Sequence, residues 1–196
     1  SAFEYCKSLQ SIHVAEDNPS YSSIDGILFS KDKKTIILIP LGKEIKEFKI
    51  PDGVTAIGKF AFLVCQSLRS IDIPDSVTTI GKSAFKGCES LQDIDIPNSV
   101  TTIGESAFSG CKSLQDIDIP NSVTMIGESA FYGCTSLQTI HMHHKNIMDC
   151  KIDEKAFNEV DFDQCTLYVP SGTRWAYRHH PAFVKFKNIE IERREK

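Results

Sequence analysis

The segment PNSVTTIGESAFSGCKSLQDIDI, residues 97–119, is one of four near-copies that follow one another along the chain. The copy before it, residues 74–96, differs at only four of 23 positions, and looser copies begin at Pro51 and Pro120. A fixed period of this length is typical of a solenoid, in which each coil buries its apolar side chains only against its neighbours. A residue that recurs in every copy therefore serves the stack, and a functional site is to be sought among residues that the copies do not share.

Each copy contains three short patterns. Two isoleucines alternate with two aspartates in residues 93–96, which predicts a short strand with one buried face. Residues 100–104 predict a second extended piece, with Gly104 permitting the turn that follows. Within residues 105–111, Ala, Phe and Cys lie at i, i+1 and i+4, which predicts a turn or two of helix.

Equivalent positions of successive coils should form columns about 4.8 Å apart, and we expect the apolar columns to be buried. The phenylalanine column contains Phe62, Phe85, Phe108 and Phe131, with Phe3 before them and Phe157 after them. The cysteine column contains Cys6, Cys65, Cys88, Cys111 and Cys134. Cys150 and Cys165 lie outside it and are either a disulfide or two separate core residues.

Two regions depart from the period, and they divide the chain into five parts. Residues 15–49 predict a coil that carries a β-hairpin, because Asp25-Gly26 is a turn signal and a polar tip at 31–34 separates two apolar runs. Residues 143–169 form a degenerate repeat, and residues 170–196, with a short helix around Arg174 to His179, predict a C-terminal cap over the last coil. Residues 1–14 are a partial repeat and 50–142 the regular ones, which suggests further repeats upstream in a parent protein.

Charge and hydropathy exclude some classes of partner. The formal net charge is −4, with acidic and basic residues interspersed, so neither nucleic acid nor an anionic membrane surface is favoured. No apolar stretch approaches the roughly 20 residues that span a bilayer, so we expect no membrane insertion by this segment.

The repeat unit I-P-x-S-V-T-x-I-G-x-x-A-F-x-x-C-x-S-L resembles the BspA-like leucine-rich repeats over almost the whole chain. The segments 18–40 and 169–189 look like that family's hairpin-bearing turn and its usual terminal cap. The resemblance implies a right-handed leucine-rich-repeat solenoid, with a parallel sheet along one side. It also implies a secreted or cell-surface protein. Such proteins come mostly from host-associated anaerobic bacteria, and some members of the family bind matrix proteins and other cells. It carries no catalytic residues to transfer and no cofactor.

The exposed face of the predicted sheet is the main candidate site. Stacked carboxylates there repel one another, and a sequence that keeps them can be using them to meet a basic partner or a divalent cation, or can merely have copied them by duplication. The predicted contacts are Asp72, Asp93, Asp95, Asp116, Asp118 and His141.

Metal binding and catalysis find less support. On a strand, His141 and His143 point to the same side and supply two ligands, half of a zinc or copper site. No hydrolase, zinc-protease or phosphate-loop motif is present, so no enzyme is expected. A Cys150 or Cys165 nucleophile with His179 or His180 is the remaining catalytic alternative.

Trp175 is either part of an aromatic binding patch or, as we favour, part of the cap. The sequence thus predicts a non-catalytic extracellular interaction or adhesion module with a protein or glycoprotein ligand, such as host matrix or a cell surface. Two other hypotheses are a structural spacer of a larger surface protein and a metal-dependent binding module. The binding role rests mainly on the family resemblance.

Overall fold

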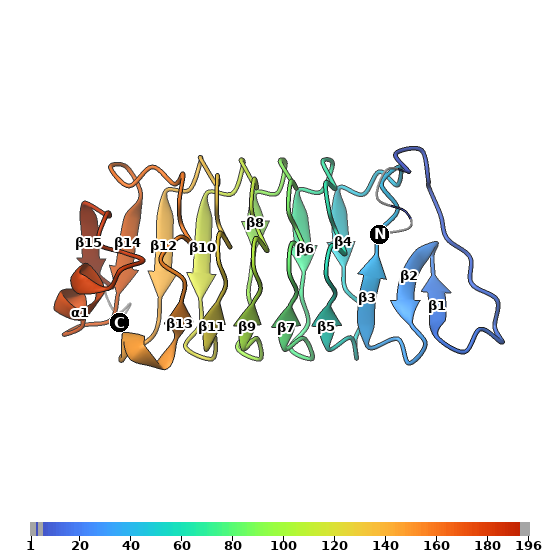
Figure 1. Cartoon of the computed structure of the whole chain (residues 1–196), viewed down its shortest axis with the longest axis horizontal. Helices are drawn as coiled ribbons and strands as arrows, with labels where there is room; N and C mark the ends of the chain where they lie inside the picture. Colours follow the sequence, from blue (N-terminus) through green and yellow to red (C-terminus); the bar gives the residue numbers. More distant parts are fainter. Residues whose placement is uncertain (1–2, 4–5, 193–196) are drawn as a thin grey trace.

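The computed structural model describes residue 3 and residues 6–192. The coils stack side by side along one axis, with residues 6–40 at one end and the only α-helix of the described residues at the other (Figure 1). Backbone strands on opposite sides of each coil join their counterparts in the next coil, and apolar side chains fill the space between. The predicted repeat solenoid is therefore confirmed.

We call the side of the solenoid that carries the Asp-Ile strands the front, and the opposite side the back. The strands of the front pair in parallel, as predicted, and form two sheets. One contains β4 (Glu47–Lys49), β6 (Ser70–Asp72) and β8 (Asp93–Ile94). The other contains β10 (Asp116–Ile119), β12 (Thr139–Met142), β14 (Thr166–Val169) and β15 (Asn188–Ile191). In β6 and β10, isoleucines point inward and aspartates outward, because successive side chains of a strand alternate between its faces.

The back side carries one continuous sheet, which the resemblance to a one-sided family fold did not predict. Its strands in spatial order are β1 (Tyr21–Ile24), β2 (Ile27–Ser30), β3 (Thr35–Leu38), β5 (Ala56–Ile57), β7 (Thr79–Ile80), β9 (Thr102–Ile103), β11 (Met125–Ile126) and β13 (Lys151–Ile152). The first three strands are antiparallel and the rest parallel. The predicted hairpin is confirmed, because β2 and β3 pair antiparallel on either side of the polar tip at 31–34. A second turn, between β1 and β2, has Asp25 and Gly26 at φ 49° and 77°.

The predicted helical turns of the regular coils are wrong. Residues 83–88 form hydrogen-bonded turns, with Ser83 and Gly87 at φ 53° and 74°. Their amides alternate between two kinds of acceptor: Phe85 N donates to Ala107 O of the next coil at 2.7 Å, whereas Cys88 N donates to Phe85 O at 3.1 Å. An amide used between coils is not free for an i−4 carbonyl, so stacking replaces helix formation.

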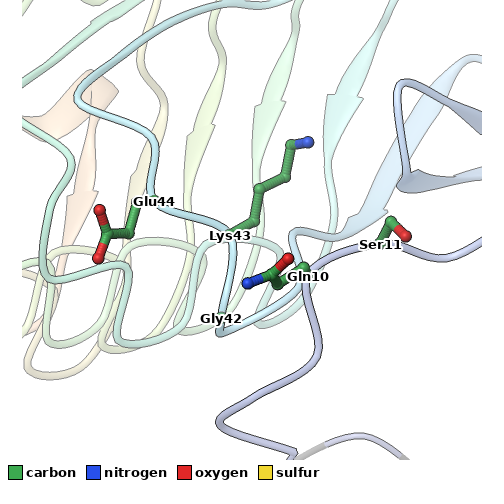
Figure 2. A pocket seen from close by; sticks show the side chains of 5 residues that line it. All are labelled: Gln10, Ser11, Gly42, Lys43 and Glu44. Atoms are coloured by element: carbon green, nitrogen blue, oxygen red, sulfur yellow. The ribbon is translucent and has the colours of Figure 1, made fainter.

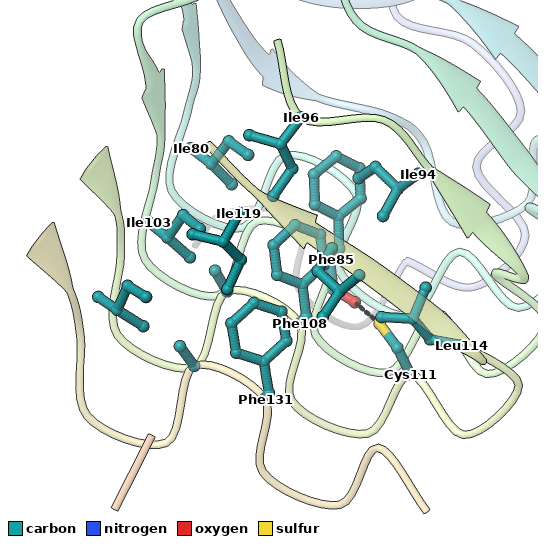
Figure 3. Packing of buried hydrophobic residues seen from close by; sticks show 14 of the residues in the cluster. Ile80, Phe85, Ile94, Ile96, Ile103, Phe108, Cys111, Leu114, Ile119 and Phe131 are labelled. Atoms are coloured by element: carbon teal, nitrogen blue, oxygen red, sulfur yellow. Dashed lines mark hydrogen bonds between the residues drawn. The ribbon is translucent and has the colours of Figure 1, made fainter. Parts of the chain in front are cut away.

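The core is a continuous stack of phenylalanine rings. Centroids of Phe85, Phe108 and Phe131 are 5.2 and 5.3 Å apart with nearly parallel planes (Figure 3). Each of these fully buried rings is worth about 2–3 kcal/mol by transfer from water. Beside the rings, the Cys111 thiol donates to the Phe85 carbonyl oxygen at 3.3 Å. Cys88 and Cys134 make the same contact with Phe62 O and Phe108 O, so these thiols use their weak donors on backbone carbonyls of the ring column.

The first residues do not join these columns. Phe3 is 36% exposed and Cys6 is exposed, so the prediction that both extend the buried columns is wrong. The chain near them lies against the hairpin instead, with Ile12 N donating to Gly26 O at 2.8 Å. The N-terminal end of the ring stack is covered by Phe48, whose ring meets Phe62 edge-on at 5.5 Å.

The C-terminal cap is confirmed, but with one error. Its helix, α1 (Arg174–His179), buries Tyr177, and Phe183 packs against Phe157 with centroids 5.4 Å apart. Trp175 instead is 74% exposed, because it lies on the side of α1 away from the core. A short 3-10 helix, η1 (Ile147–Asp149), joins β12 to β13.

Two further observations complete the fold. Cys150 and Cys165 are both buried and free, so they are two separate core residues and not a disulfide. Among the described residues, no helix has the length and apolar character needed to cross a bilayer.

Candidate functional site

Five outward carboxylates of the front sheets lie next to one another across the coils, and we call them the acidic face: Asp72, Asp93, Asp95, Asp116 and Asp118. The strand register puts Ser70 beside Asp93 in one row, and Lys49 beside Asp72 in the other. The second row continues beyond the gap between the two sheets as Asp118, His141, Tyr168 and Glu190. All five carboxylates are solvent-exposed, as the sequence predicted.

The carboxylates differ in their partners. Asp72 faces Lys49 Nζ at 3.7 Å, Asp116 accepts a hydrogen bond from the Thr139 hydroxyl, and Asp118 lies 2.6 Å from His143 Nε2. Within the part of the chain that the structure describes, Asp93 and Asp95 have neither an ion pair nor a side-chain hydrogen bond. These two side chains are therefore the part of the acidic face that is open to a partner.

The two front sheets separate at this point. β8 and β10 belong to different sheets, although β9 and β11 behind them are hydrogen-bonded neighbours. Asp93 and Asp95 lie on one side of the gap, and Asp116 and Asp118 on the other. Neighbouring strands are ordinarily about 4.8 Å apart, at which like charges repel by about 1 kcal/mol in water. The aspartates on the two sides therefore repel one another at the place where the hydrogen-bonded front sheet is interrupted.

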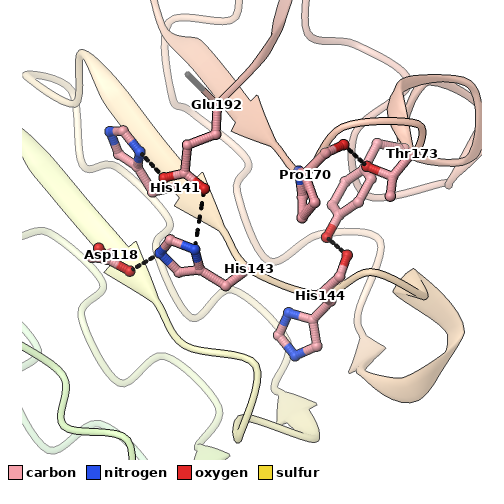
Figure 4. Close-up of polar contacts among 8 residues, drawn as sticks. Asp118, His141, His143, His144, Pro170, Thr173 and Glu192 are labelled. Carbon is pink, nitrogen blue, oxygen red and sulfur yellow. Dashed lines mark hydrogen bonds and ion pairs between the residues drawn. The ribbon is translucent and has the colours of Figure 1, made fainter. Parts of the chain in front are cut away.

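A polar cluster closes the C-terminal end of the acidic face (Figure 4). The Glu192 carboxylate lies 3.2 Å from His141 Nδ1 and 3.2 Å from His143 Nδ1, through its two oxygens. The His141 ring also stacks on Tyr168, with centroids 4.7 Å apart. Sequence reasoning missed Glu192; the alternation of residues 188–192 is the signal that could have found it.

The metal hypothesis is not supported by this geometry. His141 and His143 do point to the same side, but each faces a carboxylate. Among residue 3 and residues 6–192, no group of three or more His, Cys, Asp or Glu side chains is arranged to hold a metal ion.

His144, next in the chain, has a structural role. Its side chain is 2% exposed, its Nε2 donates to Val123 O at 2.7 Å, and its own carbonyl accepts from the Tyr177 hydroxyl at 2.9 Å. Burial lowers the pKa of His144 below its ordinary value near 6.5. The imidazole is therefore held neutral at the junction between the last regular coil and the cap.

The catalytic alternative also lacks support. Burial raises the pKa of both Cys150 and Cys165 to about 12, so these thiols stay protonated and unreactive near neutral pH. His179 does not face either of them, since its Nδ1 lies 2.8 Å from the carbonyl oxygen of Trp175 in its own helix.

A polar hollow near the N-terminal end offers no chemistry either. It has a volume of about 470 Å³ and lies where the N-terminal segment meets the loop before β4 (Figure 2). Its lining residues are Gln10, Ser11, Gly42, Lys43 and Glu44. The chain approaches itself closely there, because Gly42 N donates to Leu9 O at 2.8 Å. The hollow therefore follows from chain crossing.

Comparison with known proteins agrees with the repeat geometry. Residues 41–163 match six copies of the BspA type leucine rich repeat region. The chain belongs to this family. A leucine rich cell surface protein from Faecalibacterium prausnitzii A2-165 is 34% identical over 99% of this BspA-type chain, with a TM-score of 0.73. No curated protein shows significant similarity to this BspA-type chain.

Two other solved structures share the fold. The pneumococcal vaccine antigen PcpA has a TM-score of 0.73 at 23% identity over 94% of the BspA-type chain. A leucine-rich repeat protein from Bacteroides capillosus ATCC 29799 has a TM-score of 0.54 at 26% identity, over 68% of this chain and 99% of its own. The chain covers 45% of the Faecalibacterium protein and 51% of PcpA, so it spans about half the length of these two structures.

Proposed function

We propose that this chain is a non-catalytic interaction or adhesion module that binds a protein or glycoprotein ligand with the acidic face. The observation that carries the proposal is the pair Asp93 and Asp95, exposed and without partners among the described residues, in the middle of a row of carboxylates. Charge of one sign on a surface steers an oppositely charged partner and speeds its association. The expected ligand surface is therefore basic.

The fold supports this role by holding the face rigid. Stacked rings and inter-coil hydrogen bonds fix each strand relative to the next, so little backbone freedom is lost on binding. Solenoids use such extended surfaces for recognition. The partner would then contact several coils at once.

We further propose that the module acts outside the cell, on a surface or after secretion. A 34% identical relative is a cell surface protein, and a protein of the same fold is a vaccine antigen. Host matrix glycoproteins and host-cell surfaces are the first ligands to test. A spacer that holds another domain away from a surface is the competing function.

The test is a binding screen of the purified chain against immobilised matrix glycoproteins and host cells, at low and high salt. Binding should weaken as salt rises. The double variant Asp93→Ser, Asp95→Ser should abolish binding. The quadruple variant that also carries Asp116→Ser and Asp118→Ser should likewise not bind. As a matched control, Glu105→Ser with Glu128→Ser removes the same charge from the turns after β9 and β11. Binding that survives the first pair at every salt concentration would refute the acidic face, and the lack of any ligand would favour the spacer.

A further inference from the structure

An apolar cleft lies at the opposite end of the solenoid from the cap, on the outer side of the hairpin strands. Its volume is about 490 Å³, and its lining includes Ile12, Tyr21, Leu28, Ile37, Leu38 and Phe60. The outward residues of β7 and β9 are Thr79 and Thr102, which are polar, whereas β11 exposes Met125. The hairpin gathers several apolar side chains at one place on this side of the solenoid, and Tyr21 at its edge is 46% exposed.

One wall of the cleft is a residue in an unfavourable backbone conformation. Phe60 has φ 62°, a region that bulky side chains rarely adopt. The equivalent residues of the next three coils are Ser83, Ser106 and Ser129, at φ 53°, 54° and 55°. The chain thus keeps a costly aromatic residue where its own repeats use serine. The positive φ itself belongs to the coil geometry, since every regular coil repeats it; what sets this coil apart is the aromatic side chain at that position.

A cation lies beside this ring. Lys59 Nζ is 4.8 Å from the centroid of Phe60. The equivalent lysine of the next coil, Lys82, pairs with Glu105 at 2.7 Å. Across the described residues, Lys59 has no carboxylate partner. An exposed lysine next to an apolar cleft complements a ligand that is apolar and carries a negative charge beside its apolar part.

We propose that the cleft is a second recognition site, which takes a large apolar side chain of a partner protein with a carboxylate next to it in sequence. The apolar side chain would lie against Phe60, Leu28 and Ile37, and the carboxylate would pair with Lys59. Interface hot spots are commonly large side chains that fill a well-packed, desolvated pocket of the partner. The site is on the hairpin, so it does not depend on the acidic face.

Three peptides test the site on the full chain by NMR titration. Acetyl-Leu-Phe-Asp-Glu-amide should shift the amides of Leu28, Ile37 and Phe60 saturably at millimolar concentration. Acetyl-Leu-Phe-Asn-Gln-amide should bind several-fold more weakly, and acetyl-Ala-Ser-Asp-Glu-amide should not bind. The absence of saturable shifts, or shifts confined to other residues, would overturn the proposal.

The variants come from the chain's own repeats, so folding is retained. Phe60→Ser installs the residue of the next three coils and should weaken binding of the acidic peptide about tenfold. Lys59→Glu installs the residue found at Glu105 and Glu128, and should weaken the acidic peptide about fivefold without affecting the amide peptide. If Phe60→Ser bound the acidic peptide with unchanged affinity, the proposed site would be refuted.

Two further arms separate the alternatives. Asp93→Ser with Asp95→Ser should leave peptide binding unchanged, so failure of the acidic face and failure of the cleft are distinguishable. Dodecanoate is the probe for a lipid-like ligand. If dodecanoate shifts the cleft amides and neither Leu-Phe peptide does, the occupant is an amphiphile and the proposed protein partner is wrong.

Discussion

Gly104 shows how a single residue serves the stack. A Cβ built on it would lie 2.6 Å from Lys82 N and 2.7 Å from Gly81 C, both backbone atoms of the preceding coil. Neither atom can retreat without separating the coils. The glycine that recurs after each back strand is thus required for close approach between neighbouring backbones.

We expect Gly104→Ala to destabilise the chain by about 2–3 kcal/mol, since overpacking against backbone forces the coils apart. Gly53 is the matched control, because it has φ 86° but no atom within 4 Å of the place that a Cβ would take. Gly53→Ala should cost only about 1 kcal/mol, from the left-handed backbone alone. Chemical denaturation measures both, and equal losses would contradict the close-approach argument.

His144 makes stability depend on pH. Burial lowers the pKa of His144 in the folded chain, and burial also lowers the pKa of His180, so the unfolded chain binds protons more readily. The groups that face His144 are the Val123 carbonyl, Asp149 and His143. The stabilisation is fully present above the ordinary pKa near 6.5, and it is lost as pH falls through the lowered folded value.

We therefore expect the free energy of unfolding to decrease from pH 7 to pH 5, and His144→Gln to flatten this decrease. The glutamine amide can still donate to the Val123 carbonyl and cannot be protonated in this range. His180 should leave a residual slope. Urea titrations at several pH values measure it, and an unaltered slope in His144→Gln would assign the effect to other groups.

At the scale of elements, α1 divides its side chains between the core and solvent. Tyr177 is fully buried and donates to the His144 carbonyl, whereas Trp175 is mostly exposed and only packs on His179, with centroids 4.4 Å apart. Aromatic content alone therefore overstates which residues form the cap.

Trp175→Ser should change the free energy of unfolding by less than about 0.5 kcal/mol, as expected for an exposed site. Phe183→Ala should cost about 3–5 kcal/mol, because it empties the last position of the ring stack. Thermal and urea unfolding give both values. A large loss in Trp175→Ser would show that α1 is held differently from the arrangement described.

For the whole molecule, the charge pattern sets a cost on one side of the solenoid. The acidic face concentrates carboxylates at the gap between the two front sheets, while the back sheet runs through without a break. Salt screens exposed charges over about 10 Å at 0.1 M. Screening should therefore stabilise this side of the solenoid as ionic strength rises.

We expect the chain to gain up to about 1 kcal/mol of stability between low and high sodium chloride. Asp93→Ser with Asp95→Ser should give part of this gain at low salt and reduce the further gain at high salt. Glu105→Ser with Glu128→Ser removes the carboxylates that pair with Lys82 and Lys155, and should not stabilise. A chain whose stability is indifferent to salt in both forms would argue against repulsion at the gap.

Much of the fold follows from local pattern. The coil period, the burial of Phe108 and Cys111, and the exposure of Asp93 could all be predicted, because each coil gives its residues the same surroundings as the next. The helical turns could not, since Ala, Phe and Cys at helical spacing also fit a turn whose amides bond to a neighbouring coil. Phe3 and Cys6 match the repeat in type but lack the coil packing that buries it.

Contacts of the irregular segments depended on tertiary structure. Glu192 meets His141 and His143 from a strand far along the chain, and Phe60 meets the hairpin face, because residues that break the period are placed by how the chain folds back. Amino-acid order specifies the environment of a residue only where neighbours repeat it. At both ends of the solenoid that repetition stops, and the packing of the particular segments decides which side chains meet.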